Sequence, residues 1–262
     1  MEKKLDFIEE TPREKEIRKK VQNKAKDLRI RWAQKGLFDI FEIIENECIL
    51  IRKPLKNINV SGFTTYLNDN FIIFLNSTYT LGHERFSAAH ELGHYILHES
   101  KLKKDKILFD NEKIEYEATQ FAVELLMPEE GVREIFDKIV KLPPNKIQSR
   151  HIIRMHNYFR VSYSAMLKRL VFLGLCNKDL YNGLREIASL ENNEVLKKLE
   201  MNEGYDLSLI ESSNVNYISK EYEEIIRSNF ENNKISYKKL ESLLNFIGKK
   251  PQDYGYEVLE DE

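Results

Sequence analysis

The sequence predicts an α+β fold in which a small β-sheet lies in the first half of the chain and helices make up most of the remainder. Three short segments between residues 48 and 75 are rich in β-branched and aromatic residues, which is typical of strands. Elsewhere, apolar residues recur at the three- and four-residue spacing of amphipathic helices. The double proline Pro143-Pro144 separates the strand-containing part from a region in which every segment before the acidic end has helical spacing.

The composition excludes several classes of protein. The chain has 262 residues, of which 42% are hydrophobic, so it is long enough to bury a sizeable core. Its formal net charge of −2 predicts no strong overall attraction to nucleic acid or to a membrane. Cys48 and Cys176 are too few and too far apart for a disulfide framework or a thiolate zinc site. With neither a signal peptide nor an apolar run of about 18 residues, we expect a cytoplasmic protein without a membrane-spanning segment.

The first part of the chain begins with a basic amphipathic helix. Its lysines and arginines suggest either a nucleic-acid surface or a solvated outer face, and we favour the solvated face. Asn68-Asp69-Asn70 is a turn signal between two strands, which predicts a β-hairpin. The elements expected in this part are helices at 13–35 and 37–46 and strands at 48–51, 62–67 and 71–75.

The motif His90-Glu91-Leu92-Gly93-His94 lies on the next predicted helix. His90 and His94 are four residues apart and project from one helix face, so both imidazoles can reach one zinc ion. Glu91 lies about 100° around the helix, where it can act as a general base toward a zinc-bound water. The motif also occurs by chance on solvated helices. The apolar neighbours argue against this, because buried histidines and glutamates cost free energy unless they are bound or paired.

A catalytic zinc site needs a third protein ligand. Ser100 occupies the position where one extended class of this motif has its third histidine, which excludes that class. His98 lies two turns, about 12 Å, along the helix from His90, too far to share one ion comfortably. We expect His98 to orient the site or to satisfy a nearby polar group, and a purely structural role remains an alternative.

The predicted helix near residues 111–127 offers the third ligand. Glu117 falls inside its apolar stripe, and a carboxylate in that place needs a partner such as a metal. Glu115 is expected to point to nearly the opposite side, whereas Glu124 shares the face of Glu117 and is the competing ligand. The residues of the stripe are Ile114, Ala118, Phe121, Ala122 and Leu125.

Two linked motifs in this region resemble the ImmA/IrrE family of zinc metallopeptidases. The first is RFSAAHELGHYILH at residues 85–98, and the second is EATQFAVELLMP at residues 117–128. The shorter segments Ser61-Gly62-Phe63 and Phe71–Asn76 precede them, so the resemblance is strong over about residues 60–130. Two motifs in the correct order are much more specific than the five-residue motif alone.

The resemblance implies a zincin-like fold, with His90, His94 and Glu117 as zinc ligands and Glu91 as the catalytic carboxylate. Two positions depart from the family pattern. Ser87 replaces the usual threonine, a mild change. Thr119 stands where asparagine or aspartate is usual, which puts a supporting role at that position in question.

The resemblance also implies a protein substrate, namely a helix-turn-helix repressor or an antitoxin whose cleavage relieves repression. In zincin folds an edge strand holds the substrate as an additional strand. By this analogy the strand Phe71–Asn76 would be the edge, and the implied substrate-binding residues are Phe71, Ile73, Leu75 and Asn76.

Residues 147–174 predict a helix, a turn at Val161-Ser162 and a second helix, and they resemble a helix-turn-helix domain. No acidic residue occurs between Asp137 and Asp179, and such local basicity is typical of DNA-binding segments. We nevertheless favour packing on the peptidase or docking of its substrate over DNA contact. The basic residues are Lys146, Arg150, Arg154, Arg160, Lys168 and Arg169.

The sequence therefore predicts three parts: a zincin-like domain at 1–142, a helix-turn-helix-like segment at 143–178 and a helical module at 179–262. The favoured function is a zinc-dependent endopeptidase that cleaves a repressor or antitoxin. The alternative is a DNA- or partner-binding regulator with a vestigial zinc site. The intact His90, Glu91, His94 and Glu117 favour the enzyme.

Overall fold

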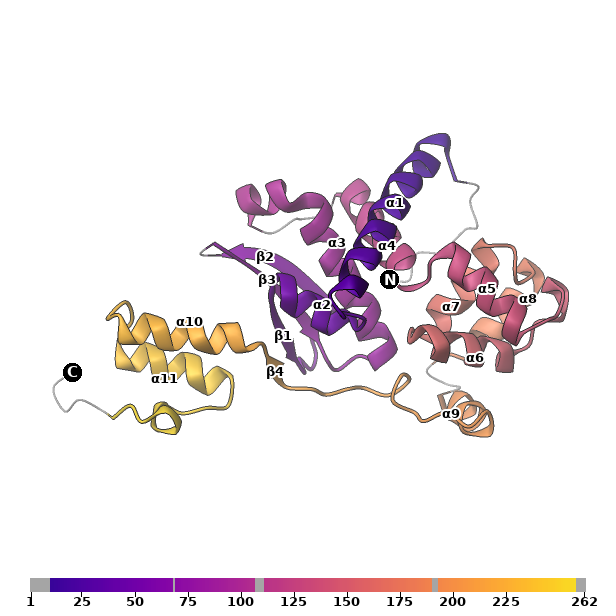
Figure 1. Ribbon diagram of the computed structural model, residues 1–262. Helices are drawn as coiled ribbons and strands as arrows, with labels where there is room; N and C mark the ends of the chain where they lie inside the picture. The colour runs from indigo at the N-terminus through magenta and orange to yellow at the C-terminus, as the bar shows by residue number, and fades with distance from the viewer. Residues whose placement is uncertain (1–9, 68, 107–110, 190–192, 258–262) are drawn as a thin grey trace.

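The computed structural model describes residues 10–67, 69–106, 111–189 and 193–257. It confirms the α+β class and the order of the predicted strands (Figure 1). The α-helices are α1 (Pro12–Gln34), α2 (Ile40–Glu47), α3 (Leu81–Asp105), α4 (Glu112–Leu126), α5 (Glu129–Ile139), α6 (Ser149–Phe159), α7 (Tyr163–Phe172), α8 (Lys178–Glu186), α9 (Asn193–Asn202), α10 (Lys220–Glu231) and α11 (Tyr237–Phe246). The strands are β1 (Ile49–Lys53), β2 (Gly62–Leu67), β3 (Asn70–Asn76) and β4 (Tyr217–Ile218), and short 3-10 helices lie at Pro144–Lys146 and Pro251–Tyr254.

The sheet has the strand order β2-β3-β1-β4. The predicted hairpin is confirmed, because β2 and β3 are antiparallel with Thr64 opposite Ile73. β1 lies parallel to β3 on its other side, and the short strand β4 adds antiparallel to β1. The expectation that everything after Pro143 is helical is therefore wrong at β4, whose two residues are too short to give an alternating pattern.

Because β3 is paired on both sides, it is an internal strand and not the edge that the resemblance implied. The edge strands of the described sheet are β2 and β4. The prediction that Phe71–Asn76 accepts a substrate strand is wrong for this reason, since its backbone groups already bond to two neighbours.

Each face of the sheet is covered by helices from a different part of the chain. The main core lies between one face and helices α1 to α4, with Trp32, Ile73 and Leu92 fully buried within it. The other face carries Ile49, Ile51 and Phe74, against which Tyr222 and Ile225 of α10 pack. The helix with the HExxH motif is thus fixed between the sheet on one side and α4 on the other.

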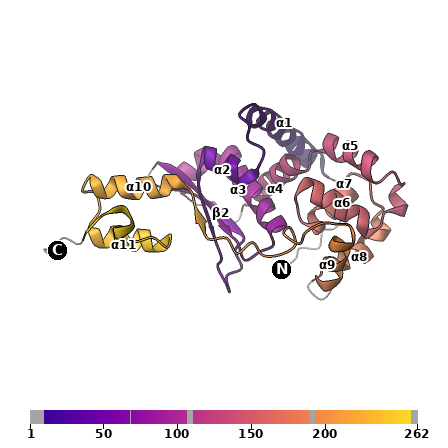
Figure 2. The same ribbon diagram turned by 60° about the horizontal axis from the view of Figure 1, so that its bottom comes forward.

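The chain after α4 forms a second core that includes residues of α5, α6 and α7. After α9 it returns along the start of α3, where the amides of Leu81 and Gly82 donate to the carbonyls of Glu211 and Leu209. It then forms β4 and the α10–α11 hairpin, which projects from the sheet (Figures 1 and 2). Since α5 and α6 share one core across Pro143, the division into three parts stays a prediction. In the described part of the chain, no helix combines the length and apolar character needed to cross a membrane.

Candidate metal centre

Helix α3 brings His90 and His94 to the surface that faces α4. Thr80 caps the helix, and its 25 residues are interrupted by a kink at His98, where the backbone angles are not helical. Gly93 lies between the two histidines and allows a close approach, since a Cβ there would lie 3.2 Å from the Cα of Ala118 on α4. This contact places the first turns of α4 directly opposite the histidine pair.

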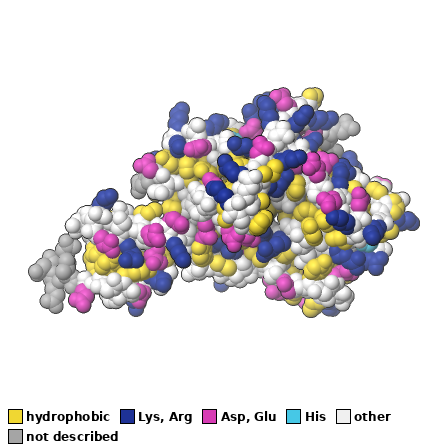
Figure 3. All heavy atoms as spheres, viewed as in Figure 1, with side chains coloured by type: hydrophobic (Ala, Val, Ile, Leu, Met, Phe, Trp, Pro, Cys, Tyr) yellow, Lys and Arg dark blue, Asp and Glu magenta, His cyan; other side chains and the backbone are white. Residues whose placement is uncertain are grey.

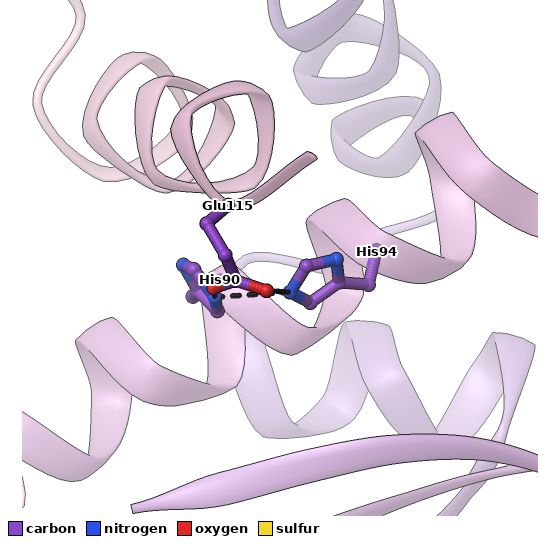
Figure 4. Close-up of side chains that lie close together, drawn as sticks. All are labelled: His90, His94 and Glu115. Atoms are coloured by element: carbon purple, nitrogen blue, oxygen red, sulfur yellow. Dashed lines mark hydrogen bonds and ion pairs between the residues drawn. The ribbon is translucent and has the colours of Figure 1, made fainter. Parts of the chain in front are cut away.

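Three side chains converge between α3 and α4 (Figure 4). The Nε2 atoms of His90 and His94 approach to 3.0 Å. Glu115 of α4 places Oε2 3.2 Å from His90 Nε2 and Oε1 3.3 Å from His94 Nε2. The donor atoms of the three residues all lie within 4.8 Å of one another.

This donor set fits a divalent metal ion. Two imidazoles and one carboxylate are a common ligand set, and three side chains leave a coordination position open. His90 Nδ1 lies 3.3 Å from the hydroxyl of Thr119, which turns its Nε2 toward the cluster. Thr119 therefore supports His90 even though it departs from the family pattern. Hydrogen bonds to His90 and His94 hold the pKa of Glu115 far below its usual value, so the carboxylate is ready to bind a cation.

The structure differs from the prediction at the third carboxylate. Glu115 does not point away, and Glu117 is not beside the two histidines. Glu117 instead places Oε2 2.9 Å from Nε2 of His98. Within the described residues, the group that could hold a metal contains Glu115 and not Glu117.

The width of the buried stripe on α4 explains the difference. At about 100° per residue, the stripe extends over an arc of about 100° from Phe121 to Ala122. Glu115 lies about 20° beyond the Ala122 edge and Glu117 about 40° beyond the Phe121 edge. Both carboxylates therefore flank the stripe, and the sequence does not specify which edge faces the histidines.

The competing candidate Glu124 lies elsewhere and has another partner. Its side chain is fully buried and accepts a hydrogen bond of 2.9 Å from Arg169 of α7. The guanidinium also donates to the carbonyl of Met127 at 3.0 Å. Glu124 thus connects α4 to the second core and is not available to the candidate metal centre.

His98 lies one turn beyond His94, where α3 departs from helical geometry. Its ring centroid is 5.7 Å from that of His94, and its described hydrogen bond joins Glu117. Burial lowers the pKa of His98. A role in orienting the site stays a prediction, because this pair lies beside the cluster without bonding to its members among the described residues.

Glu91 lies beside the cluster on the side of β2, as the helix geometry predicts. Its carboxylate is buried, and the Thr64 hydroxyl approaches Oε2 at 2.8 Å. Burial raises the pKa of Glu91, whereas the two histidines and the Thr64 hydroxyl oppose this shift. Gly62 of β2 leaves room for the Glu91 side chain, since a Cβ at position 62 would lie 3.2 Å from Glu91 Cγ.

The four residues that the resemblance implied as substrate-binding make contacts within the fold. Ile73 and Leu75 are fully buried in the main core. Phe71 packs between the rings of Tyr66 and Tyr95. The Asn76 amide donates to the carbonyls of Leu55 and Val60 and holds the loop before β2. The strand that borders the candidate metal centre is β2, whose Thr64 was not singled out from the sequence.

The helix-turn-helix-like segment has the predicted helices, α6 and α7, but α7 is largely buried. Three of its basic residues form ion pairs within the chain, and of these only Arg169 is buried. Arg154 pairs with Glu203 at 2.6 Å, Arg160 contacts Asp39, and Arg169 pairs with Glu124. Figure 3 shows Lys and Arg interspersed with Asp and Glu on the face viewed. These contacts disfavour the DNA-binding alternative.

The fold and the site together define an α+β protein with a candidate metal centre on an HExxH helix. The family model described as the IrrE N-terminal-like domain, a peptidase family, matches residues 47–171. The chain is 32% identical over 153 residues to the metallopeptidase ImmA of Bacillus subtilis, covering 56% of this chain and 83% of ImmA. It is 40% identical over 73 residues to the uncharacterized immunity region protein 2 of Bacillus phage phi105, covering 27% of this chain and 46% of that protein.

The chain therefore belongs to the ImmA/IrrE family of metallopeptidases. The resemblance inferred from the two linked motifs is confirmed. The family match ends within α7, so the helices from α8 onward and the strand β4 lie outside it.

Proposed function

We propose that the protein is a zinc-dependent endopeptidase with His90, His94 and Glu115 as the zinc ligands and Glu91 as the general base. One observation carries the proposal. Two imidazoles and a carboxylate converge beside a buried glutamate, next to an edge strand of the sheet. These are the components needed for metal-assisted hydrolysis of a peptide bond.

The bound zinc ion would act as a Lewis acid that polarises the scissile carbonyl. The chain supplies the remaining chemistry. Glu91 accepts a proton from the attacking water and delivers it to the leaving nitrogen. Its burial favours this exchange, because a carboxylate whose pKa is raised by desolvation takes up a proton more readily.

The substrate segment would lie extended along β2, the edge strand beside Glu91. Backbone groups of alternate residues point outward from an edge strand. The Tyr66 amide is one of these, and it donates to the carbonyl of Lys106 at the end of α3. Gly62 and Thr64 lie four and two residues before Tyr66 in β2, so their backbone groups also point away from β3. These groups form the part of the edge that can pair with a substrate strand.

The proposed substrate is a helix-turn-helix repressor or an antitoxin. Two observations support this proposal: the family to which the chain belongs, and its similarity to a relative described as a phage immunity region protein. Cleavage of such a protein would relieve repression.

The test is to identify a small helix-turn-helix protein encoded next to this one and to incubate it with the zinc-loaded protein. Glu91→Gln is expected to retain zinc and to lose cleavage by at least about 100-fold, the low end of what a general base contributes. Glu99→Gln is the matched control, since Glu99 lies exposed on the same helix and pairs with Lys103. A fully active Glu91→Gln protein would refute the mechanism.

A further inference from the structure

The hydroxyl of Thr64 is the group on β2 that contacts the proposed general base. Its Oγ1 lies 2.8 Å from Oε2 of Glu91 and 2.9 Å from the carbonyl oxygen of the same residue. Thr64 is only 4% exposed and Glu91 only 7%. A hydroxyl has a single proton, so Thr64 donates it to two acceptors of one residue, shared or in alternation.

This contact fixes one of the two carboxylate oxygens. Within the described part of the chain, no hydrogen bond reaches the other oxygen, Oε1. The carboxylate is therefore held by one oxygen while the second remains able to accept a proton. A carboxylate without this bond would be free to rotate about its terminal torsion, which is broad and roughly two-fold.

β2 also restricts Glu91 by shape. A Cβ at Gly62 would lie 3.2 Å from Glu91 Cγ and 2.8 Å from the backbone oxygen of Phe74. The backbone at Gly62 thus packs directly against the stem of the glutamate side chain, while Thr64 holds its end. Two alternate residues of the edge strand therefore define where the carboxylate lies.

We propose that Thr64 is a positioning residue that holds the Glu91 carboxylate at a fixed position relative to a substrate strand paired with β2. This inference rests on the proposed function. The backbone of Thr64 would pair with the substrate while its side chain holds the base. One residue then sets the distance between the scissile bond and the group that activates water. A displacement of a catalytic group by about 1 Å can cost about 100-fold in rate.

The simpler interpretation is that Thr64 is a structural residue whose buried hydroxyl only needs a hydrogen-bond acceptor, which the carbonyl of Glu91 in α3 provides. The two interpretations differ in what substitution changes. Thr64→Val keeps the size and branching suited to a strand and removes the hydroxyl, whereas Thr64→Ser keeps the hydroxyl. A structural role predicts altered stability alone, but a positioning role predicts altered kcat with unchanged KM and unchanged zinc content.

The experiment uses the full-length zinc-loaded protein and compares the wild type with Thr64→Val, Thr64→Ser and Glu91→Ala. We expect Thr64→Val to lower kcat by about 10- to 100-fold while its KM stays within about twofold of the wild type. Thr64→Ser, which keeps the hydroxyl, should retain most of the wild-type activity. Zinc content and melting temperature identify any variant that has lost its fold. A Thr64→Val protein that is folded and has wild-type kcat would overturn the proposal.

A second measurement needs no substrate. Acetohydroxamate is a small zinc-binding probe whose hydroxyl proton a correctly placed carboxylate can accept. We expect Glu91→Ala and Thr64→Val both to weaken its binding by at least about fivefold in calorimetry, and Thr64→Ser to leave it within about twofold, because only the first two lose a placed acceptor. If Glu91→Ala leaves both cleavage and binding unchanged, the proposed function fails. If Glu91→Ala weakens both but Thr64→Val weakens neither, only the role of Thr64 fails.

Discussion

Replacement of Glu115 and Glu117 by glutamine, one at a time, decides which carboxylate completes the metal centre. The two residues lie two positions apart on α4 but contact different histidines. Glu115 lies 3.2 and 3.3 Å from the Nε2 atoms of His90 and His94. Glu117 lies 2.9 Å from His98 and 3.5 Å from Lys113.

The size of the expected effect follows from these contacts. Loss of a residue that only supports a metal ligand typically costs about 10- to 100-fold in affinity. Loss of a ligand should exceed this range, so Glu115→Gln is expected to weaken zinc binding by more than about 100-fold, or about 2.8 kcal/mol. Glu117→Gln keeps an amide that can still bond to His98, and we expect a change of less than about tenfold.

The assay is competition for zinc between each variant and a chromogenic chelator, with unfolding followed with and without zinc. Binding to the folded state at 100 times the dissociation constant stabilises it by about 2.7 kcal/mol. The wild type and Glu117→Gln should show this stabilisation, and Glu115→Gln should show little of it. Loss of zinc by Glu117→Gln together with retention by Glu115→Gln would refute the assignment.

Three further predictions concern packing and the helix-turn-helix-like segment. Gly93→Val should lower the free energy of unfolding by about 1–3 kcal/mol in urea titration, because its side chain would collide with Ala118; unchanged stability would contradict this. Arg169→Met should cost about 3–5 kcal/mol, since it leaves Glu124 buried without its partner, and adding Glu124→Leu should recover part of this loss in the same titration. Charge reversal at the exposed Lys168 should leave DNA retention on a duplex column unchanged, and sequence-selective retention that Lys168→Glu abolishes would revive the regulator hypothesis.

The sequence was sufficient to predict how His90, Glu91 and His94 lie relative to one another, because all three are on one helix. Residues four apart face the same side whatever the helix packs against. The hairpin was also predicted, since its turn lies between two β-rich segments that are adjacent in the chain. Local rules determine both features.

The third carboxylate and the edge strand could not be predicted because they depend on packing between elements. Glu115 and Glu117 flank the same stripe of α4, and only the rotation of α4 against α3 selects one of them. Likewise, β3 is internal only because β1, which precedes it in the chain, pairs with it in parallel. The strand that remains at the edge beside Glu91 is β2, which no periodic pattern distinguishes from β3.

The helix-turn-helix-like segment supports both helices of the candidate metal centre. At the start of α3, a Cβ on Gly82 would lie 2.8 Å from the backbone nitrogen of Ser162, so the turn of the segment packs directly against that helix. At the end of α4, Arg169 binds the buried Glu124 and the carbonyl of Met127. A segment that packs on both helices cannot leave to bind DNA without exposing these contacts to water. We therefore expect this segment to stay packed against both helices of the candidate metal centre, which favours a structural role over DNA contact.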